Sequence, residues 1–302
     1  MIDVCLLGTG GTMPLPDRAL TSLLVRCGGR CFLVDCGEGT QVQIRKSPIS
    51  IHDIDVILIT HFHADHIMGL PGLLLSMAKS DRTEKVTIIA PKGAERIISC
   101  LCVTAPVMPF PIEIIEISNK HEEFVFDNLT ITAQLANHSV VCYAYSFSLP
   151  RSGRFDAAAA SSLGVDVKLW KTLQRGESIM SDGKLITPDM VMGKPRRGLK
   201  LTYCTYTRPT EMLRELAMGS DLFICEGMYA DDEKYAMAVE KRHMLFSEAA
   251  DLAKTANVGE LWLTHFSPSL AKPHEYRRYL TELFSNGMIP NDLEYKTLNY
   301  TE

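Results

Sequence analysis

The chain has 302 residues, 46% of them hydrophobic and 22% charged, and a formal net charge of −5. This length suits one large α/β domain or two small ones with a sizeable core, and the composition is that of an ordinary globular protein. The net charge argues against a protein that binds nucleic acid over its whole surface, although it leaves room for a local basic patch.

The N-terminal residues Met1-Ile2-Asp3-Val4 lead directly into a strand-like run, with no basic segment before an apolar one, so we expect no signal peptide. Short apolar runs separated by glycine-rich turns follow, and the run at 55–60 is apolar enough to predict a buried strand. A hairpin is expected across Gly28-Gly29. The expected elements of this half are strands at 4–7, 22–26, 31–35, 55–60 and 86–90, and helices at 70–77 and through Ile98.

The second half also mixes strands and helices. Alternating apolar and polar residues at 124–126 and 129–132 predict strands within 110–148. We expect Ser247 to cap a helix that runs to Ala256, with Glu248 early in the helix, where the dipole favours it. Further strands are expected at 201–203, 222–225 and 261–264. The mixture predicts an α/β or α+β fold, although the pattern alone leaves the order of strands in the sheets open.

Residues 151–200 differ from the rest of the chain. They are polar and rich in glycine, and their ten basic and five acidic residues give a local charge of +5 within a chain of −5. We interpret this stretch as an inserted arm with a basic surface. The alternative is a solvated loop whose charge has no function.

The nine cysteines are odd in number and include no C-x-x-C pair, which predicts free thiols and a reducing compartment. No apolar run reaches the roughly 18 residues that a membrane span needs. We therefore expect a cytoplasmic protein that does not bind a membrane.

The segment His61-Phe62-His63-Ala64-Asp65-His66 places three histidines and a carboxylate directly after the buried strand. Imidazole and carboxylate are the ligands that a zinc-like ion prefers, and a catalytic zinc keeps an open position for water. In an extended turn the side chains of His61 and His63 point to the same side. A helix then begins, and the side chains of Asp65 and His66 point towards a second position next to the first. This arrangement suits two metal ions. The alternative is a polar loop with chance histidines.

These motifs resemble the metallo-β-lactamase superfamily and, within it, the ribonuclease Z family. The resemblance covers essentially the whole chain and implies a four-layer αββα sandwich with metals at one edge, and a homodimer. It rests on Leu7-Gly8-Thr9-Gly10-Gly11, Asp35-Cys36-Gly37-Glu38-Gly39-Thr40-Gln41, Thr60 to Leu73, Arg154-Phe155-Asp156, Thr207-Arg208-Pro209 and Thr264-His265-Phe266-Ser267-Pro268.

The resemblance also implies the roles of single residues. His61, His63 and His138 would hold one Zn²⁺ and Asp65, His66 and His265 a second, with one or two ions bound and Mn²⁺ as an alternative metal. Asp65 is also expected to be catalytic. His138 and His265 are lone histidines, which only the resemblance makes ligands. His52, His121 and His274 have no such support, and we expect them at the surface.

The chain departs from the family at Tyr206, which stands two residues before Arg208, where the family has an aspartate that bridges the two metals. A phenol offers one oxygen and is normally neutral, so one metal site could be weakened. Cys204, two residues earlier, is interpreted as a small apolar residue. Glu226 matches an acidic residue that orients a histidine, and His243 matches the histidine that protonates the leaving oxygen.

The reaction that the resemblance implies is phosphodiester hydrolysis, with removal of the 3′ trailer of precursor tRNA as the expected activity and tRNA or another RNA as the partner. In the family the arm binds tRNA, but this arm lacks the Gly-Pro pair of the family. Two alternatives stay open. One is a phosphodiesterase that acts on a small substrate such as a cyclic nucleotide. The other is an RNA-binding homologue whose catalysis Tyr206 has weakened.

Overall fold

A computed structural model describes residues 1–105 and 107–300 of the chain. Its contacts divide the chain into two compact units. The main unit consists of Met1–Ser148 and the chain from Leu199 onward, and the inserted unit is Leu149–Gly198. None of the helices among the described residues is long and apolar enough to cross a membrane.

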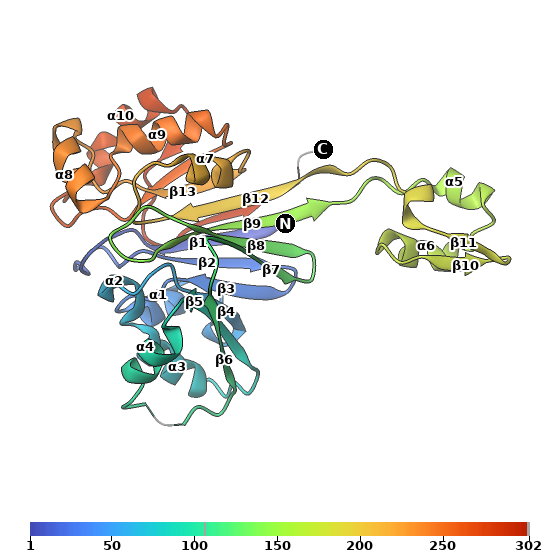
Figure 1. Cartoon of the computed structure of the whole chain (residues 1–302), viewed down its shortest axis with the longest axis horizontal. Helices are drawn as coiled ribbons and strands as arrows, with labels where there is room; N and C mark the ends of the chain where they lie inside the picture. The colour runs from blue at the N-terminus through green and yellow to red at the C-terminus, as the bar shows by residue number, and fades with distance from the viewer. Residues whose placement is uncertain (106, 301–302) are drawn as a thin grey trace. The chain divides into compact units, whose positions relative to one another are not determined.

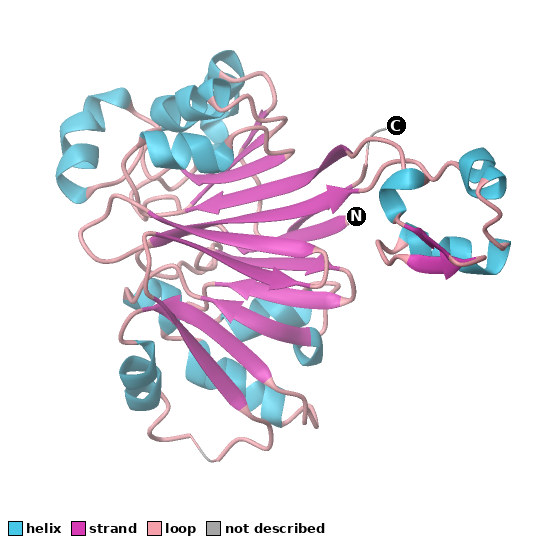
Figure 2. Cartoon of the chain, turned by 45° about the vertical axis from the view of Figure 1, so that its right-hand side comes forward, coloured by secondary structure: helices cyan, strands magenta, loops and turns pink. Residues whose placement is uncertain are grey.

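Two large sheets form the centre of the main unit, and helices cover their outer faces (Figures 1 and 2). Within the described residues each sheet has seven strands. The first has the order β16 (Glu294–Leu298), β1 (Ile2–Gly8), β2 (Ser22–Cys27), β3 (Arg30–Val34), β4 (Ile54–Leu58), β5 (Val86–Pro91) and β6 (Ile112–Ile117). The second has the order β15 (Gly287–Met288), β14 (Leu261–Thr264), β13 (Leu222–Glu226), β12 (Arg196–Cys204), β9 (Tyr143–Arg151), β8 (Leu129–Leu135) and β7 (His121–Phe126).

The helices form the two outer layers, so the expected αββα arrangement is confirmed (Figure 1). Beside the first sheet lie α1 (Thr40–Lys46), α2 (Ala64–Ile67), α3 (Leu70–Ala78), α4 (Ala94–Leu101) and the 3₁₀ turn Ile51–Asp53. Beside the second lie α7 (Glu211–Ala217), α8 (Tyr235–Lys241), α9 (Phe246–Thr255), α10 (Arg277–Leu283) and the 3₁₀ turns Asp232–Lys234 and Pro273–Tyr276.

Burial on both faces explains why central strands such as β1 are apolar without alternation, whereas the edge strand β7 alternates between exposed and half-buried residues. Every residue of β1 is buried. Its residues Cys5 and Leu7 belong to the core between the first sheet and its helices, while Val4 and Leu6 point to the opposite face and are fully buried as well. Between the sheets, the ring of Phe32 contacts that of Phe147, with centroids 5.9 Å apart. The predicted hairpin across Gly28-Gly29 is confirmed as β2 and β3.

The predicted start of the helix near residue 247 is wrong by two residues. The helix α9 begins at Phe246 after Leu245, and the side chain of Glu248 accepts a hydrogen bond from the Leu245 amide at 3.0 Å. Ser247 lies in the first turn and donates instead to Asp232 at 2.6 Å. The carboxylate of Glu248, three residues into the helix, therefore caps the Leu245 amide, and no serine cap is present at this helix start.

The inserted unit is folded around a small core of its own. It contains α5 (Ala157–Ser162), α6 (Val167–Gln174), a hairpin of β10 (Ile179–Ser181) and β11 (Lys184–Ile186), and the 3₁₀ turn Pro188–Met190. Its core consists of Ala160, Val165, Leu173, Ile179, Ile186 and Val191. Asp156 and Asp166 cap α5 and α6, each accepting a hydrogen bond from a backbone amide at 2.9 Å. The stretch is therefore a small folded module rather than a solvated loop.

Two glycines allow the ligand-bearing turn to approach the loop after β3. The Cys36 amide donates to His66 O at 2.8 Å, and the Gly69 amide donates to Cys36 O at 2.9 Å. A Cβ atom at Gly69 would lie only 1.9 Å from Gly37 O, which is backbone and cannot rotate away. The segment around His66 is therefore fixed by backbone contact.

We predict that Gly69→Ala lowers the free energy of unfolding by about 1–3 kcal/mol, because the added methyl group must separate these two loops. Urea unfolding measures the change. Gly193→Ala is the matched control, because its Cβ atom would have only ordinary contacts, at 3.4 Å or more, and should change stability by less than about 0.5 kcal/mol. Equal stability of the two variants would show that the close approach at Gly69 is unimportant.

Candidate metal centre

The expected site residues converge at one edge of the two sheets. His61 follows β4 of the first sheet, while Glu226 ends β13 and His265 follows β14 of the second. The carboxyl ends of parallel strands meet at the same edge of a sheet, which is where α/β proteins place their binding sites. His138, in the loop between β8 and β9, reaches the same place, since its ring centroid lies 5.3 Å from that of His61.

Three sets of three potential ligands result among the described residues: two are the sets predicted from the sequence, and the third is Glu226, His243 and His265. Within each set the donor atoms lie within 4.8 Å of one another. The three-histidine set is His61, His63 and His138, and the Asp65 set is Asp65, His66 and His265. The structure therefore groups all six residues as the sequence predicted.

The Asp65 set forms a nearly equilateral triangle of donor atoms. Asp65 Oδ2 lies 3.4 Å from His66 Nε2 and 3.4 Å from His265 Nε2, and the two nitrogens are 3.3 Å apart. A tetrahedral metal ion with bonds of about 2.0–2.1 Å has ligand atoms about 3.4 Å apart. This set fits such an ion without rearrangement. The backbone amide of Thr12 also donates to Asp65 Oδ2, at 2.7 Å, and helps to hold the carboxylate in place.

A buried carboxylate behind the site orients two of the ligands. Asp35, fully buried, accepts hydrogen bonds from the Thr60 amide at 2.8 Å, the Thr60 hydroxyl at 2.9 Å and His66 Nδ1 at 2.7 Å. The Thr60 hydroxyl, which donates to Asp35, can only accept from His61 Nδ1, 2.9 Å away. Both imidazoles therefore carry their proton on Nδ1 and present the lone pair of Nε2 to the site.

The remaining atoms of the three-histidine set also fit a metal. His61 Nε2 is buried and has no hydrogen-bond partner among the described residues. His63 Nδ1 and His138 Nε2 lie 3.5 Å apart, which is close to the spacing of ligands on one ion. A buried imidazole nitrogen without a partner is costly unless something binds it. The donor set thus indicates a metal-binding site.

The electrostatics of the two sets differ. Burial, together with the neighbouring histidines, lowers the pKa of His61 well below its usual value and that of His138 to about 3, so both offer neutral lone pairs at pH 7. Burial alone would lower the pKa of His66, but the carboxylates of Asp35 and Asp65 outweigh it and raise the pKa to about 10. Positive charge is therefore favoured in the Asp65 set.

Glu226 and His243 form a hydrogen-bonded pair beside the two sets. Fully buried Glu226 accepts from His243 Nδ1 at 2.8 Å through Oε2 and from the Thr207 amide at 2.7 Å through Oε1. The guanidinium of Arg208 donates to His243 O at 2.5 Å and pairs with Glu248. These contacts orient the His243 ring with Nδ1 towards the carboxylate, so its Nε2 is the nitrogen left for other contacts.

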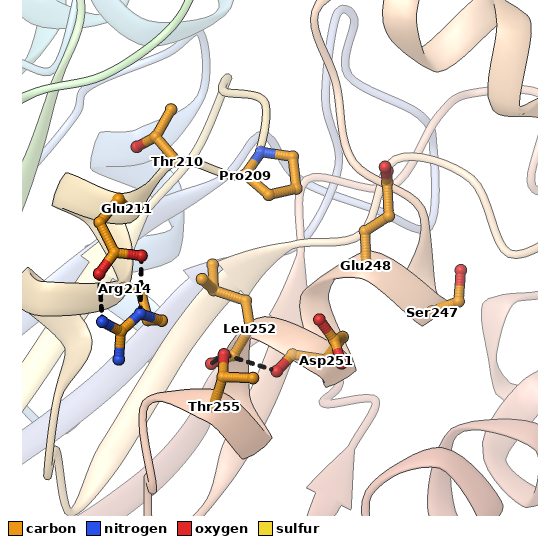
Figure 3. A pocket seen from close by; sticks show the side chains of 9 residues that line it. All are labelled: Pro209, Thr210, Glu211, Arg214, Ser247, Glu248, Asp251, Leu252 and Thr255. Carbon is orange, nitrogen blue, oxygen red and sulfur yellow. Dashed lines mark hydrogen bonds and ion pairs between the residues drawn. The ribbon is translucent and has the colours of Figure 1, made fainter.

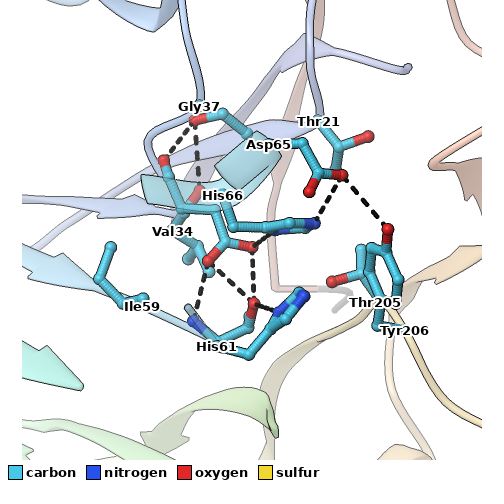
Figure 4. Close-up of polar contacts among 12 residues, drawn as sticks. Thr21, Val34, Gly37, Ile59, His61, Asp65, His66, Thr205 and Tyr206 are labelled. Atoms are coloured by element: carbon cyan, nitrogen blue, oxygen red, sulfur yellow. Dashed lines mark hydrogen bonds and ion pairs between the residues drawn. The ribbon is translucent and has the colours of Figure 1, made fainter. Parts of the chain in front are cut away.

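Tyr206 lies inside the cluster, with only 6% of its surface exposed. Its hydroxyl is 3.5 Å from Asp65 Oδ2, and Asp65 in turn contacts His66 (Figure 4). Burial raises the pKa of the Tyr206 phenol, and the nearby Asp65 carboxylate raises it further. Cys204 is fully buried in the core of the second sheet, in agreement with its interpretation as an apolar residue.

The sequence analysis assigned no role to Asp35, Thr60 or the Thr12 amide. The motif that begins at Asp35 was visible, but only the fold brings it beside His66. Of the histidines expected at the surface, His52 and His121 have side chains that are 45% and 58% exposed. His274 is partly exposed, with its Nδ1 atom buried.

A separate surface cavity of about 550 Å³ lies between α7 and α9 and contains none of the six ligand residues (Figure 3). Its polar groups are paired with one another: Arg214 with Glu211, Thr255 with the Asp251 carbonyl, and Glu248 with Arg208. Because these groups are already satisfied, the cavity carries no evidence of a ligand. It is lined by Pro209, Thr210, Glu211, Arg214, Ser247, Glu248, Asp251, Leu252 and Thr255.

Comparisons with known proteins agree with this geometry. The chain is 51% identical over 300 residues to a protein of Lachnoclostridium phytofermentans named ribonuclease Z, covering 99% of both chains. It is 49% identical over 302 residues to a ribonuclease Z of Agathobacter rectalis, covering both completely. Its fold matches the crystal structure of the short form of human tRNase Z with a TM-score of 0.71, at 23% identity over 99% of this chain and 100% of that one. The family described as anti-Pycsar protein Apyc1 matches residues 2–103.

We predict that Asp35→Asn weakens metal binding about 10–100-fold, because an amide cannot accept all three hydrogen bonds and no longer fixes the tautomers of His61 and His66. Competition with a chromophoric chelator measures the affinity. Asp3→Asn is the control, since Asp3 is also buried but lies on β1 and bonds to Arg26 and Thr297. If Asp35→Asn binds metal as tightly as the control does, Asp35 has no positioning role.

Proposed function

The chain belongs to the ribonuclease Z family, and from that premise we propose that it is a metal-dependent endoribonuclease that removes the 3′ trailer of precursor tRNA. The family relationship covers the full chain at 51% identity. The structural observation that carries the proposal is the convergence of two three-donor sets and the Glu226–His243 pair at one edge of the sheets. A hydrolase that cleaves a phosphodiester needs these parts together.

We propose zinc as the metal, with His61, His63 and His138 as one set of ligands and Asp65, His66 and His265 as the other. Neutral imidazoles with one carboxylate suit zinc better than they suit magnesium or calcium, and Mn²⁺ is a second candidate. When bound, such an ion polarises the phosphate and lowers the pKa of water to near neutrality.

The chain's own residues supply the proton and the orientation. His243 holds one proton on Nδ1 against Glu226 Oε2, at 2.8 Å, which leaves Nε2 to donate a proton to the leaving 3′ oxygen. Through this hydrogen bond the Glu226 carboxylate fixes the plane of the ring. Asp65 acts as an anionic ligand whose position the Thr12 amide maintains.

RNA binding is the function we propose for the inserted unit. Leu149–Gly198 has nine basic and five acidic residues, a charge of +4 within a chain of −5. The side chains of Lys168, Lys171, Arg175 and Lys184 belong to exposed residues. Basic side chains contact phosphates without reading sequence, which suits an enzyme that must bind many different tRNAs.

A cytoplasmic homodimer is the state that we propose. The nine cysteines are free, as a reducing compartment would keep them. Exposed apolar side chains occur at Val42 on α1, Leu75 on α3, which contacts α1, and Met68 just before α3, with 50%, 39% and 52% of their surface accessible. Such a group of side chains is suited to burial against a second copy of the chain.

The test is incubation with a precursor tRNA and with a small chromogenic phosphodiester side by side. We predict that the protein releases the 3′ trailer, and that His66→Ala, a ligand of the Asp65 set, loses metal and cleavage together, at least about a hundredfold in rate. Exposed His121 provides the control variant, His121→Ala, which should behave like the parent.

Full activity and metal content in His66→Ala would contradict the ligand assignment. Cleavage of the small phosphodiester alone would favour a small natural substrate. Binding of RNA without metal or cleavage would favour a non-catalytic homologue.

Deletion of residues 155–192 tests the role of the inserted unit in binding RNA. Gly193 N donates to Arg154 O at 2.8 Å, so the new ends are already close. We expect the deletion to weaken the binding of precursor tRNA by at least about tenfold, because several phosphate contacts are lost, and to leave hydrolysis of the small phosphodiester unchanged. Binding and turnover are measured at one salt concentration. Equal loss of both would mean that the unit is needed for the fold rather than for the substrate.

A further inference from the structure

Tyr206 occupies the middle of the histidine cluster. Its ring centroid lies 4.3 Å from that of His265, 4.5 Å from His243 and 4.6 Å from His61. His138 is also at 4.6 Å, and His63 and His66 are at 5.2 Å. These are the separations of aromatic rings in direct contact. The phenol ring therefore contacts members of both the three-histidine set and the Asp65 set.

The hydroxyl group of this ring is directed at the Asp65 set. Tyr206 Oη lies 3.5 Å from Asp65 Oδ2 (Figure 4), and Asp65 Oδ2 forms a triangle of 3.3–3.4 Å sides with His66 Nε2 and His265 Nε2. The corners of a tetrahedron around a metal ion are separated by about 3.4 Å. The phenol oxygen is therefore at the right distance from Asp65 Oδ2 to be the fourth corner of that set.

The backbone at Tyr206 gives a second, independent indication. Its φ angle is +53°, in the left-handed region that aspartate and asparagine tolerate better than bulky residues do. A tyrosine held in this conformation is strained, and such strain persists where the surroundings require one side-chain position. The strain here places the phenol in the ligand cluster.

We propose that Tyr206 makes this a one-metal centre, in which Oη is the fourth protein ligand of a single ion held by Asp65, His66 and His265, and water or phosphate would join as a fifth ligand. This inference rests on the metal site of the proposed function and deepens it. The ring contacts both donor sets without bringing a carboxylate to them, and two dications a few ångströms apart repel strongly without a shared anion. The three-histidine set has no charged ligand to offset that repulsion.

The experiment counts metal ions and measures affinity in three proteins, the parent, Tyr206→Phe and Tyr206→Asp, after equilibration in one zinc-buffered solution. We expect one zinc per chain in the parent and in Tyr206→Phe, and two in Tyr206→Asp. Because Tyr206→Phe keeps the ring and loses only the oxygen, its zinc affinity should fall by at least about tenfold. Tyr203→Phe is the matched control, because Tyr203 is a buried tyrosine on β12, three residues earlier.

Cobalt(II) substitution gives a readout that is independent of turnover. The visible spectrum of the cobalt protein depends on the atoms that coordinate the ion, so it should differ between the parent and Tyr206→Phe and be the same in Tyr203→Phe. Two zinc ions in the parent, or one in Tyr206→Asp, would overturn the one-metal centre. An unchanged affinity and spectrum in Tyr206→Phe would overturn the ligand role.

The same measurements separate this inference from the proposed function. One zinc per chain with Oη-dependent affinity, but no cleavage of precursor tRNA, would leave the inference standing and reject the proposed function. Cleavage by a protein that holds two zinc ions would do the reverse. Absence of metal from all three proteins would reject both.

Discussion

The buried carboxylate of Asp35 is the constraint on which the rest of the site depends. It receives the Thr60 amide and hydroxyl and the Nδ1 proton of His66, and through Thr60 it also sets the tautomer of His61. Two imidazoles on different elements therefore present Nε2 to one point. A carboxylate with no exposed surface is tolerated because each of its oxygens is hydrogen-bonded. Removing those bonds would free the rings to rotate, and the donor sets would lose their spacing.

The two sheets are held together at the same edge. The hydroxyl of Tyr145, on the second sheet, donates to Ile59 O at 2.7 Å, and the Tyr143 amide donates to Thr60 O at 2.9 Å, just before the first ligand. On the other side, the His265 amide donates to the Thr21 hydroxyl at 3.1 Å. Ligands from both sheets are thus positioned by hydrogen bonds that cross between the sheets. Sandwich packing and site geometry are therefore consequences of the same contacts.

Much of this could be predicted from the sequence where the signal was local. The strand before His61 and the spacing of the four ligands that follow depend only on neighbouring residues, and the structure agrees. His138 and His265 are distant in the chain, so only the family resemblance pointed to them. The role of Asp35 depends on the fold, which brings it 2.7 Å from His66. The helix start near residue 247 was misjudged because a glutamate three residues into a helix can satisfy the same amide as a serine cap.

Charge explains why a single substitution at position 206 can alter the number of metals without disturbing the fold. Within the six donors only Asp65 is anionic, while Asp35 and Glu226 lie behind His66 and His243. The charge of one dication is balanced by the carboxylates of Asp65 and Asp35. A second dication would place two further positive charges beside three neutral imidazoles, in a buried site of low dielectric. An aspartate at position 206 would add a second carboxylate beside Asp65 and offset part of that charge. The hydrogen bonds of the Asp35 network and of the Glu226–His243 pair are made by residues other than Tyr206, whose ring packs 4.5 Å from that of His243. The orienting hydrogen bonds therefore do not depend on which residue stands at position 206.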